Sequence, residues 1–181
     1  MSGRAAGCQR TAPEMRKLSI SLAFIVFAAD LLTKWWVKTS LWREDYPIVE
    51  EFVTIHYVEN TGIAFGLFHD SKSQWKSPLL SLLAVVAMCM VLYYIWTTAV
   101  DEHVILVALG LVLGGILGNF VDRLTHQYVV DFIKLHWRDV FAWPTFNLAD
   151  SAITTGVLLI LALSLFGSHN QELTEGSPVS E

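Results

Sequence analysis

The chain has 181 residues, 54% of them hydrophobic and 16% charged, and a net charge of −5. Its mean hydropathy of +0.48 is too high for an ordinary soluble domain, and the apolar residues are gathered into long blocks. No cluster of Lys and Arg resembles a nucleic-acid-binding surface, so nucleic acid is excluded as a partner. Composition therefore predicts an α-helical membrane protein.

Four apolar blocks predict four transmembrane helices. The second and third contain no charged residue over 18 positions each, which at about 1.5 Å of rise per residue approaches the thickness of a bilayer core. The blocks are Leu18 to Val37, Leu79 to Trp96, Val104 to Val121 and Ser151 to Phe166.

Four basic residues precede the first block, and this arrangement also occurs in cleavable secretory signals. Asp30, Lys34 and Trp35 continue the same helix beyond its small residues, which favours an uncleaved first span with an aromatic collar at the interface. The basic residues predict a cytoplasmic N-terminus, and four spans return the C-terminus to the cytoplasmic side.

Two segments between the blocks have the composition of β-strands. Pro47 to Val58 is rich in β-branched and aromatic residues with rough alternation, and Tyr128 to Trp137 is similar. Because both segments fall on one side of the membrane, we expect them to pair into a small sheet above the helices. The predicted organisation is a mobile tail over 1–15, a four-helix domain over 16–167 with β-rich loops 39–77 and 123–146, and a mobile tail over 168–181.

Two carboxylates are candidates for chemistry. Asn147 lies at a predicted helix N-cap and Asp150 at the third helical position, where a carboxylate stabilises any helix and is favoured in its charged form. Asp131 lies within an apolar strand, where desolvation favours its neutral form. If the fold brings the two together, one shared proton makes them the acid and base of an aspartic-protease dyad.

Asp122 is a rival partner for Asp150. The adjacent Arg123 can neutralise Asp122, which favours a structural ion pair, and Asn119 shares a helix face with Asp122. Asn119 is expected to donate either to a dyad carboxylate, to a substrate carbonyl or to another helix. In the first span, the spacing of Asp30 and Lys34 predicts an ion pair.

Gly114 and Gly115 predict close helix packing in the third span. The six histidines lack metal-ligand spacing such as His-Glu-x-x-His, and no Ser or Cys lies in a recognisable nucleophile elbow. We therefore expect no metal and no cofactor.

Five blocks of sequence occur in an order that is typical of one family. They are Asp30 to Lys34, Asn60 to Gly66, Gly114 to Arg123, Val129 to Phe132 and Phe146 to Ser151. In these blocks the chain resembles the lipoprotein signal peptidases, or type II signal peptidases, which are bacterial inner-membrane aspartic proteases. Any single block is a weak signal, whereas five in order across Asp30 to Ser151 are highly specific.

The resemblance implies four transmembrane helices with a small extracytoplasmic β-cradle. It also implies cleavage of diacylglyceryl-modified prolipoproteins before the lipidated cysteine, near the periplasmic face of the inner membrane. The expected partners are these substrates and membrane lipid, with the protein acting as a monomer and without a cofactor.

The resemblance also assigns roles to single residues. It implies that Asp131 and Asp150 form the catalytic dyad. It implies that Asn60, Asn119, Arg123 and Asn147 bind substrate or orient the dyad. In the loop from Asn60 to Gly66 we also expect Gly62 and Phe65 to bind substrate, with the Phe65 ring either closing over the substrate or lying at the membrane interface. The positions expected to be structural or supporting are Asp30, Lys34, Asp122 and Ala149.

Two alternatives belong to other functional classes. A small transporter or proton channel also keeps carboxylates in a membrane, but usually at mid-span rather than at helix ends. A non-catalytic scaffold that binds lipoproteins needs Asn119, Arg123 and Asn147 but not two acids. Proteolysis by the purified protein separates both from the enzyme.

Overall fold

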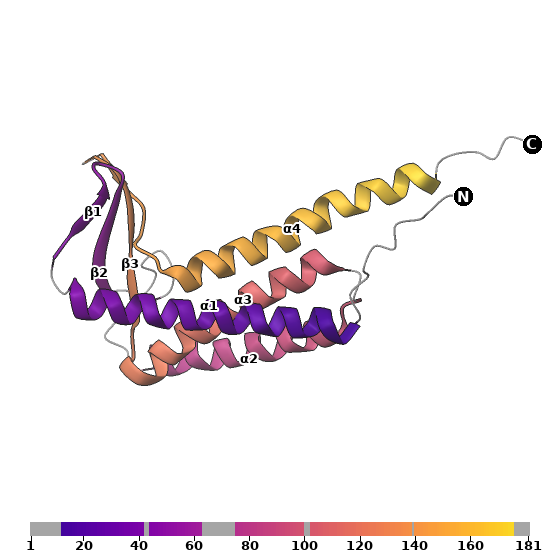
Figure 1. Cartoon of the computed structure of the whole chain (residues 1–181), viewed down its shortest axis with the longest axis horizontal. Helices are drawn as coiled ribbons and strands as arrows, with labels where there is room; N and C mark the ends of the chain where they lie inside the picture. Colours follow the sequence, from indigo (N-terminus) through magenta and orange to yellow (C-terminus); the bar gives the residue numbers. More distant parts are fainter. Residues whose placement is uncertain (1–11, 42–43, 63–74, 100–101, 139, 176–181) are drawn as a thin grey trace, which may run out of the picture.

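The computed structural model describes residues 12–41, 44–62, 75–99, 102–138 and 140–175 (Figure 1). These residues form four helices that are long and apolar enough to cross a membrane and a four-stranded antiparallel sheet, which confirms the predicted fold class. The elements in chain order are α1 (Ala12–Ser40), β1 (Tyr46–Val49), β2 (Val53–Asn60), α2 (Lys76–Thr97), α3 (His103–His126), β3 (Val129–Trp137), β4 (Phe141–Ala142) and α4 (Leu148–Glu175).

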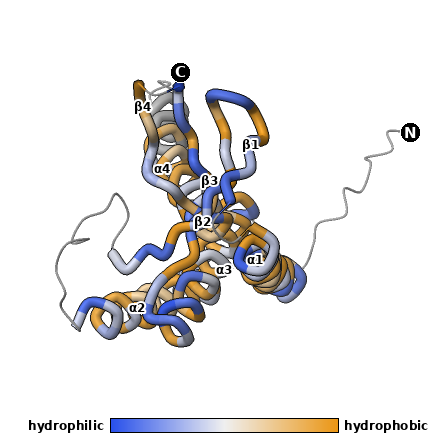
Figure 2. Tube along the Cα trace, turned by 90° about the vertical axis from the view of Figure 1, so that its left-hand side faces the viewer, coloured by the Kyte–Doolittle hydropathy of each residue, from blue (hydrophilic) through white to orange (hydrophobic). Residues whose placement is uncertain are grey.

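Helix α3 is the centre of the bundle and packs against α1, α2 and α4. In its most apolar window 56% of the residues are buried inside the protein, against 11% to 22% in the other three helices. Figure 2 looks along the bundle and shows α3 beside α1 and α2, with the sheet at the end nearer the viewer. The apolar side chains that the other helices leave exposed suit contact with lipid.

Glycines on α3 allow this close packing, as the sequence predicts. A Cβ atom added to Gly114 would lie 2.5 Å from the Ala23 carbonyl oxygen on α1, and one added to Gly115 would lie 2.5 Å from the Ala149 carbonyl oxygen on α4. Small residues at helix contacts let backbones approach closely in a membrane, where apolar burial between helices drives association only weakly.

Replacing Gly115 by Ala should lower the free energy of unfolding by about 1–3 kcal/mol, because the new methyl group meets both the Ala149 carbonyl oxygen and Ile153 Cγ1, which lies 2.7 Å from the ideal Cβ position. Thermal melts of the purified variant in detergent measure this effect. The greater helix propensity of Ala acts in the opposite direction, so an unchanged or higher melting temperature would contradict the packing argument.

The sheet lies beyond one end of the bundle, and its strands follow one another in the order β1, β2, β3, β4. Strand β2 pairs antiparallel with β3, with Val58 opposite Asp131 and Asn60 opposite Val129, so the two predicted strand segments do form one sheet. The first segment, predicted as a single strand, is divided into β1 and β2 by a turn over 50–52. Glu51 adopts a φ of 66° in this turn, which ends β1 and reverses the chain.

The helices extend beyond the predicted spans. Helix α3 ends at His126 rather than Val121, so Arg123, which falls in the predicted loop 123–146, belongs to the last turn of this helix. Helix α1 begins at Ala12, inside the segment predicted as a tail, and α4 continues to Glu175 although its apolar window ends at Phe166. Hydrophobicity marks the part of a helix that meets lipid, whereas backbone hydrogen bonding continues into polar residues.

Candidate active site

The N-terminus of α4 is closed by a reciprocal cap. Asp150 N–H donates to Asn147 Oδ1 at 2.9 Å, and Asn147 N–H donates to Asp150 Oδ2 at 3.3 Å. This is the geometry of a capping box with Asp at the third position, and it confirms the predicted N-cap. The second oxygen of Asp150, Oδ1, accepts a hydrogen bond from Asn119 Nδ2 on α3 at 2.7 Å.

Asp131 lies on β3 and is 2% exposed. Asn147 Nδ2 donates to its Oδ1 at 2.7 Å, and Asn60 Nδ2 donates to its Oδ2 at 2.8 Å. Burial of the carboxyl group, followed by the nearby charge of Asp150, raises the pKa of Asp131 to about 7. The Asn60 and Asn147 hydrogen bonds act in the opposite direction, since they favour the carboxylate.

Asn60 is itself oriented by a local turn. Its Oδ1 accepts a hydrogen bond from Gly62 N–H at 2.9 Å, which directs its Nδ2 toward Asp131. Gly62 is buried beside it. Phe65, the third predicted residue of this segment, lies outside the described residues.

Backbone pairing brings the start of α4 to β3. Phe146 accepts hydrogen bonds through its carbonyl oxygen from Phe132 N–H at 3.0 Å and Ile133 N–H at 2.8 Å, and its own N–H donates to Ile133 O at 3.1 Å. Asn147 follows directly, so its backbone reaches Asp150 while its side chain reaches Asp131. One residue therefore joins the two carboxylates that the sequence proposes as a dyad.

Both carboxylates line one cavity of about 700 Å³ between α2, α3, α4 and the sheet. Asn60, Asn119 and Arg123 also line it. The cavity is open and mainly apolar on its helix side, where Leu83 and Ala87 of α2 face Ile153 of α4. Such a site can hold an extended peptide next to an apolar segment.

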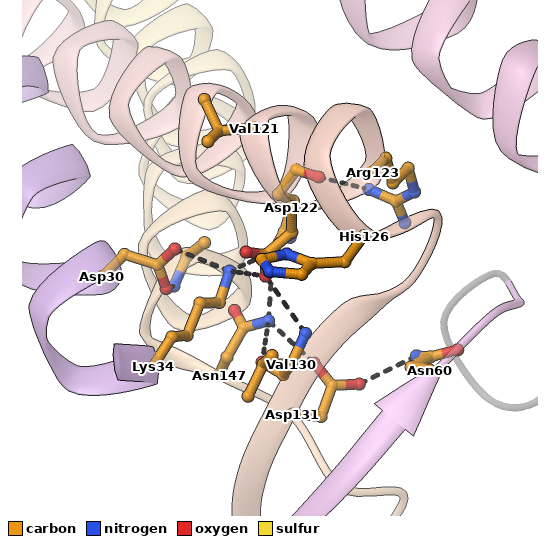
Figure 3. A network of polar contacts seen from close by, with 12 residues as sticks. Asp30, Lys34, Asn60, Val121, Asp122, Arg123, His126, Val130, Asp131 and Asn147 are labelled. Atoms are coloured by element: carbon orange, nitrogen blue, oxygen red, sulfur yellow. Dashed lines mark hydrogen bonds and ion pairs between the residues drawn. The ribbon is translucent and has the colours of Figure 1, made fainter. Parts of the chain in front are cut away.

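A buried ion cluster lies next to Asp131 (Figure 3). Lys34 Nζ lies 2.6 Å from Asp30 Oδ2 and 3.1 Å from Asp122 Oδ2, and it donates to Asn119 Oδ1 at 2.9 Å. Asp122 Oδ2 also accepts from Val130 N–H at 3.1 Å, next to Asp131. Lys34 and Asp30 are 3% and 0% exposed, so the ion pair predicted from their spacing is buried inside the protein.

The predicted pairing of Asp122 with Arg123 is wrong. Arg123 Nη1 donates instead to Asn119 O at 3.2 Å, and Asp122 pairs with Lys34 on another helix. Adjacent residues on a helix point in different directions, so a neighbour in sequence does not share a face. Arg123 thereby lies at the dyad cavity, separate from the ion cluster.

The supporting residues connect α1 to the start of α4. Ala149 N–H donates to Asp30 Oδ1 at 2.9 Å, and Ala149 is fully buried. Gly118, which no motif argument selected, gives Asp30 its space, because an added Cβ would overlap Asp30 Oδ2. Its place four residues after Gly114, on the same helix face, is the signal that could have found it.

Metal-binding side chains do not gather in the described part of the chain. Within residues 12–41, 44–62, 75–99, 102–138 and 140–175, no group of three or more His, Cys, Asp and Glu side chains is placed to hold a metal ion.

Residues 22–166 match the family model described as signal peptidase (SPase) II. The chain belongs to the signal peptidase II family. Membership of a peptidase family identifies the protein as a protease of the bacterial inner membrane and disfavours the transporter and scaffold alternatives.

Relatives of this peptidase match it over most of their length. A lipoprotein signal peptidase of Solibacter usitatus is 38% identical over 150 residues, covering 82% of this chain and 91% of the relative. One from Symbiobacterium thermophilum is 40% identical over 150 residues, covering 82% and 95%. A solved structure described as a bacterial membrane enzyme is 28% identical with a TM-score of 0.75, covering 91% of this chain and 95% of the other.

Proposed function

We propose that this peptidase removes the signal peptide of diacylglyceryl-modified prolipoproteins by cleaving before the lipidated cysteine, with Asp131 and Asp150 as its catalytic pair. The observation that carries the proposal is that Asn147 donates hydrogen bonds to both carboxylates, and that both carboxylates line one cavity. The names of the relatives support the substrate class.

The two carboxyl groups differ in a way that suits acid and base roles. Asp131, with its pKa raised to about 7, holds a proton that it can give to the scissile carbonyl oxygen. Asp150, at the N-terminus of α4, takes a proton from the attacking water. The tetrahedral intermediate then collapses: the C–N bond breaks as the departing amine receives the proton held by Asp150, and Asp131 takes back the hydroxyl proton as the carbonyl group re-forms.

Uncharged and cationic residues complete the proposed site. Asn119 and Asn147 hold the carboxylates in place through bonds of 2.7 Å each. Arg123 and Asn60 line the same cavity, and we assign them to substrate carbonyl groups together with Gly62. Phe65 is proposed to close over the bound substrate.

The substrate is proposed to enter from the bilayer between α2 and α4. Helices α2 and α4 both pack on α3, and the C-terminal part of α4 turns away from the bundle (Figure 1). Apolar residues of α2 and α4 line the dyad cavity. An apolar signal helix that lies between α2 and α4 places its cleavage site at the end of the bundle next to the sheet. We assign that end to the periplasm, place both termini in the cytoplasm and propose that the protein acts as a monomer.

Cleavage should depend strongly on the lipid of the substrate, because an anchor holds the scissile bond at the depth of the carboxylates. Purified protein in detergent is given the same precursor with and without its diacylglyceryl group, and the products are identified by mass. We expect about 100-fold faster cleavage of the lipidated form. Equal rates would contradict lipid recognition, and cleavage at another bond would contradict the assigned position.

The pH profile of kcat/KM should have a limb near pH 7 at which activity falls as pH rises. Asp131 must be protonated to act as the acid, and its pKa is raised to about 7. Asn60→Ala removes a hydrogen bond that favours the carboxylate, so it should move this limb to higher pH by about half to one unit. Asp45→Asn, in the exposed pair with His56, is the control that should not move it. A limb that moves to lower pH in Asn60→Ala would contradict the assignment.

A further inference from the structure

A second cavity of about 560 Å³ lies between the last turns of α1 and α3, beside Val130. We call it the α1–α3 groove. Among the described residues it shares no lining side chain with the dyad cavity. Its inner wall contains Lys34 and Asp122 of the ion cluster, which Figure 3 shows from close by.

The lining changes from apolar to polar along the helices. Leu31 and Val121 lie toward the middle of the bundle, whereas Lys38, Thr125 and His126 lie one to two turns nearer the sheet. Trp35 stands at the same groove and is 65% exposed. Exposed Trp marks the headgroup level of a bilayer, so the polar end of the groove lies at that level and its apolar end at the level of acyl chains.

Tyr128 positions two basic groups at the polar end. Lys38 Nζ donates to the Tyr128 hydroxyl at 3.3 Å and lies 5.7 Å from the centre of its ring. The His126 ring lies 5.4 Å from that of Tyr128, and its Nδ1 is 2.8 Å from Thr125 Oγ1. Tyr128 thus contacts both the Lys38 ammonium group and the His126 imidazole on one side of the groove.

Two carboxylates face this region, and each has a bonding partner. Asp122 is paired with Lys34 and accepts from Val130 N–H. Glu59 accepts from the Tyr57 hydroxyl, which lies 3.5 Å from the Tyr128 hydroxyl. Lys34 lies between the carboxylates of Asp30 and Asp122, so this buried cluster adds no net positive charge to the groove. The cation at the mouth is Lys38, which is charged even when His126 is neutral.

We propose that the α1–α3 groove binds one anionic phospholipid of the surrounding bilayer, with the phosphate at Lys38 and His126 and an acyl chain along Leu31 and Val121. A phosphate that is joined through glycerol to two acyl chains matches the change from basic to apolar lining. A zwitterionic lipid carries the same phosphate but adds a cation beside Lys38, so charge favours the anionic lipid. This inference does not depend on the peptidase activity.

Native mass spectrometry of the full chain in neutral detergent tests the proposal. Phosphatidylglycerol and phosphatidylcholine of equal chain length are added separately, and glycerol 3-phosphate serves as a free phosphate. We expect one phosphatidylglycerol to bind about five-fold more tightly than phosphatidylcholine, and glycerol 3-phosphate to bind undetectably. Equal binding of the two lipids, or binding of glycerol 3-phosphate at the same concentrations, would overturn the proposal.

Variants locate the lipid. Lys38→Gln should weaken phosphatidylglycerol binding about five-fold, the double variant with His126→Gln should weaken it further, and Lys38→Arg should retain it. Lys17→Gln removes an exposed charge at the opposite end of α1 and should leave binding unchanged. Thermal melts establish that each variant is folded. Wild-type affinity in the folded double variant, or an equal loss in Lys17→Gln, would show that the lipid does not bind in this groove.

Discussion

Replacing either Asp131 or Asp150 by Asn should lower turnover by about 10³-fold while the protein remains folded. Asn keeps the size of the side chain and an oxygen acceptor for the Asn147 hydrogen bonds, but it cannot supply or take a proton. Because the two groups act on one reaction step, the double variant should be little worse than either single variant. Residual cleavage of a lipidated precursor and thermal melts measure both effects.

Two further carboxylates serve as controls for this result. Asp45→Asn changes an exposed carboxylate on the approach to β1 and should leave turnover unchanged. Asp122→Asn should give a partial loss of activity together with lower stability, because Asp122 binds Lys34 and Val130 rather than substrate. Full loss in Asp122→Asn and Asp150→Asn, with an active Asp131→Asn, would assign the dyad to Asp122 and Asp150. Substantial activity in Asp150→Asn would end the aspartic-protease mechanism.

Lys34→Met should cause the largest loss of stability of any single change considered for this protein, about 3–5 kcal/mol in the free energy of unfolding. Met keeps the length of the side chain but leaves the buried carboxylates of Asp30 and Asp122 without their cation. A melting temperature lower by roughly 10 °C in detergent is the expected measurement.

Lys17→Met is the matched control, since it removes an exposed Lys from the same helix and should change the free energy of unfolding by less than about 0.5 kcal/mol. Adding Asp122→Asn to Lys34→Met should recover part of the loss, because only one buried carboxylate then lacks a cation. If Lys34→Met melts like the parent protein, the ion cluster does not hold α1, α3 and the start of α4 together.

Local features of the site could be predicted from the sequence because they depend on the spacing of residues within one helix or strand. Asn147 and Asp150 are three residues apart, and the cap they form is present as predicted. Asp30 and Lys34 are four residues apart on one helix and do pair. The four transmembrane helices could also be predicted from the apolar blocks, because a bilayer imposes a minimum length on any spanning helix.

The partner of Asp150 required more than local pattern. From the residues alone, Asp122 remained a rival to Asp131, although its neighbour Arg123 favoured a structural role for it. The resemblance to the family then assigned the dyad to Asp131 and Asp150. In the structure the pairing of Phe146 with β3 places Asn147 between Asp150 and Asp131, while Asp122 faces Lys34.

By itself, the sequence determined the membrane class, the four spans, the α4 cap and, through five ordered blocks, the family. The tertiary structure alone decided which distant groups meet: Lys34 with Asp122, Asn119 with Asp150, and the basic mouth of the α1–α3 groove. The physical reason is that spacing along one helix or strand fixes only which side chains share a face. Which faces then meet depends on helix packing, here the close approach of α1 and α4 to the glycines of α3.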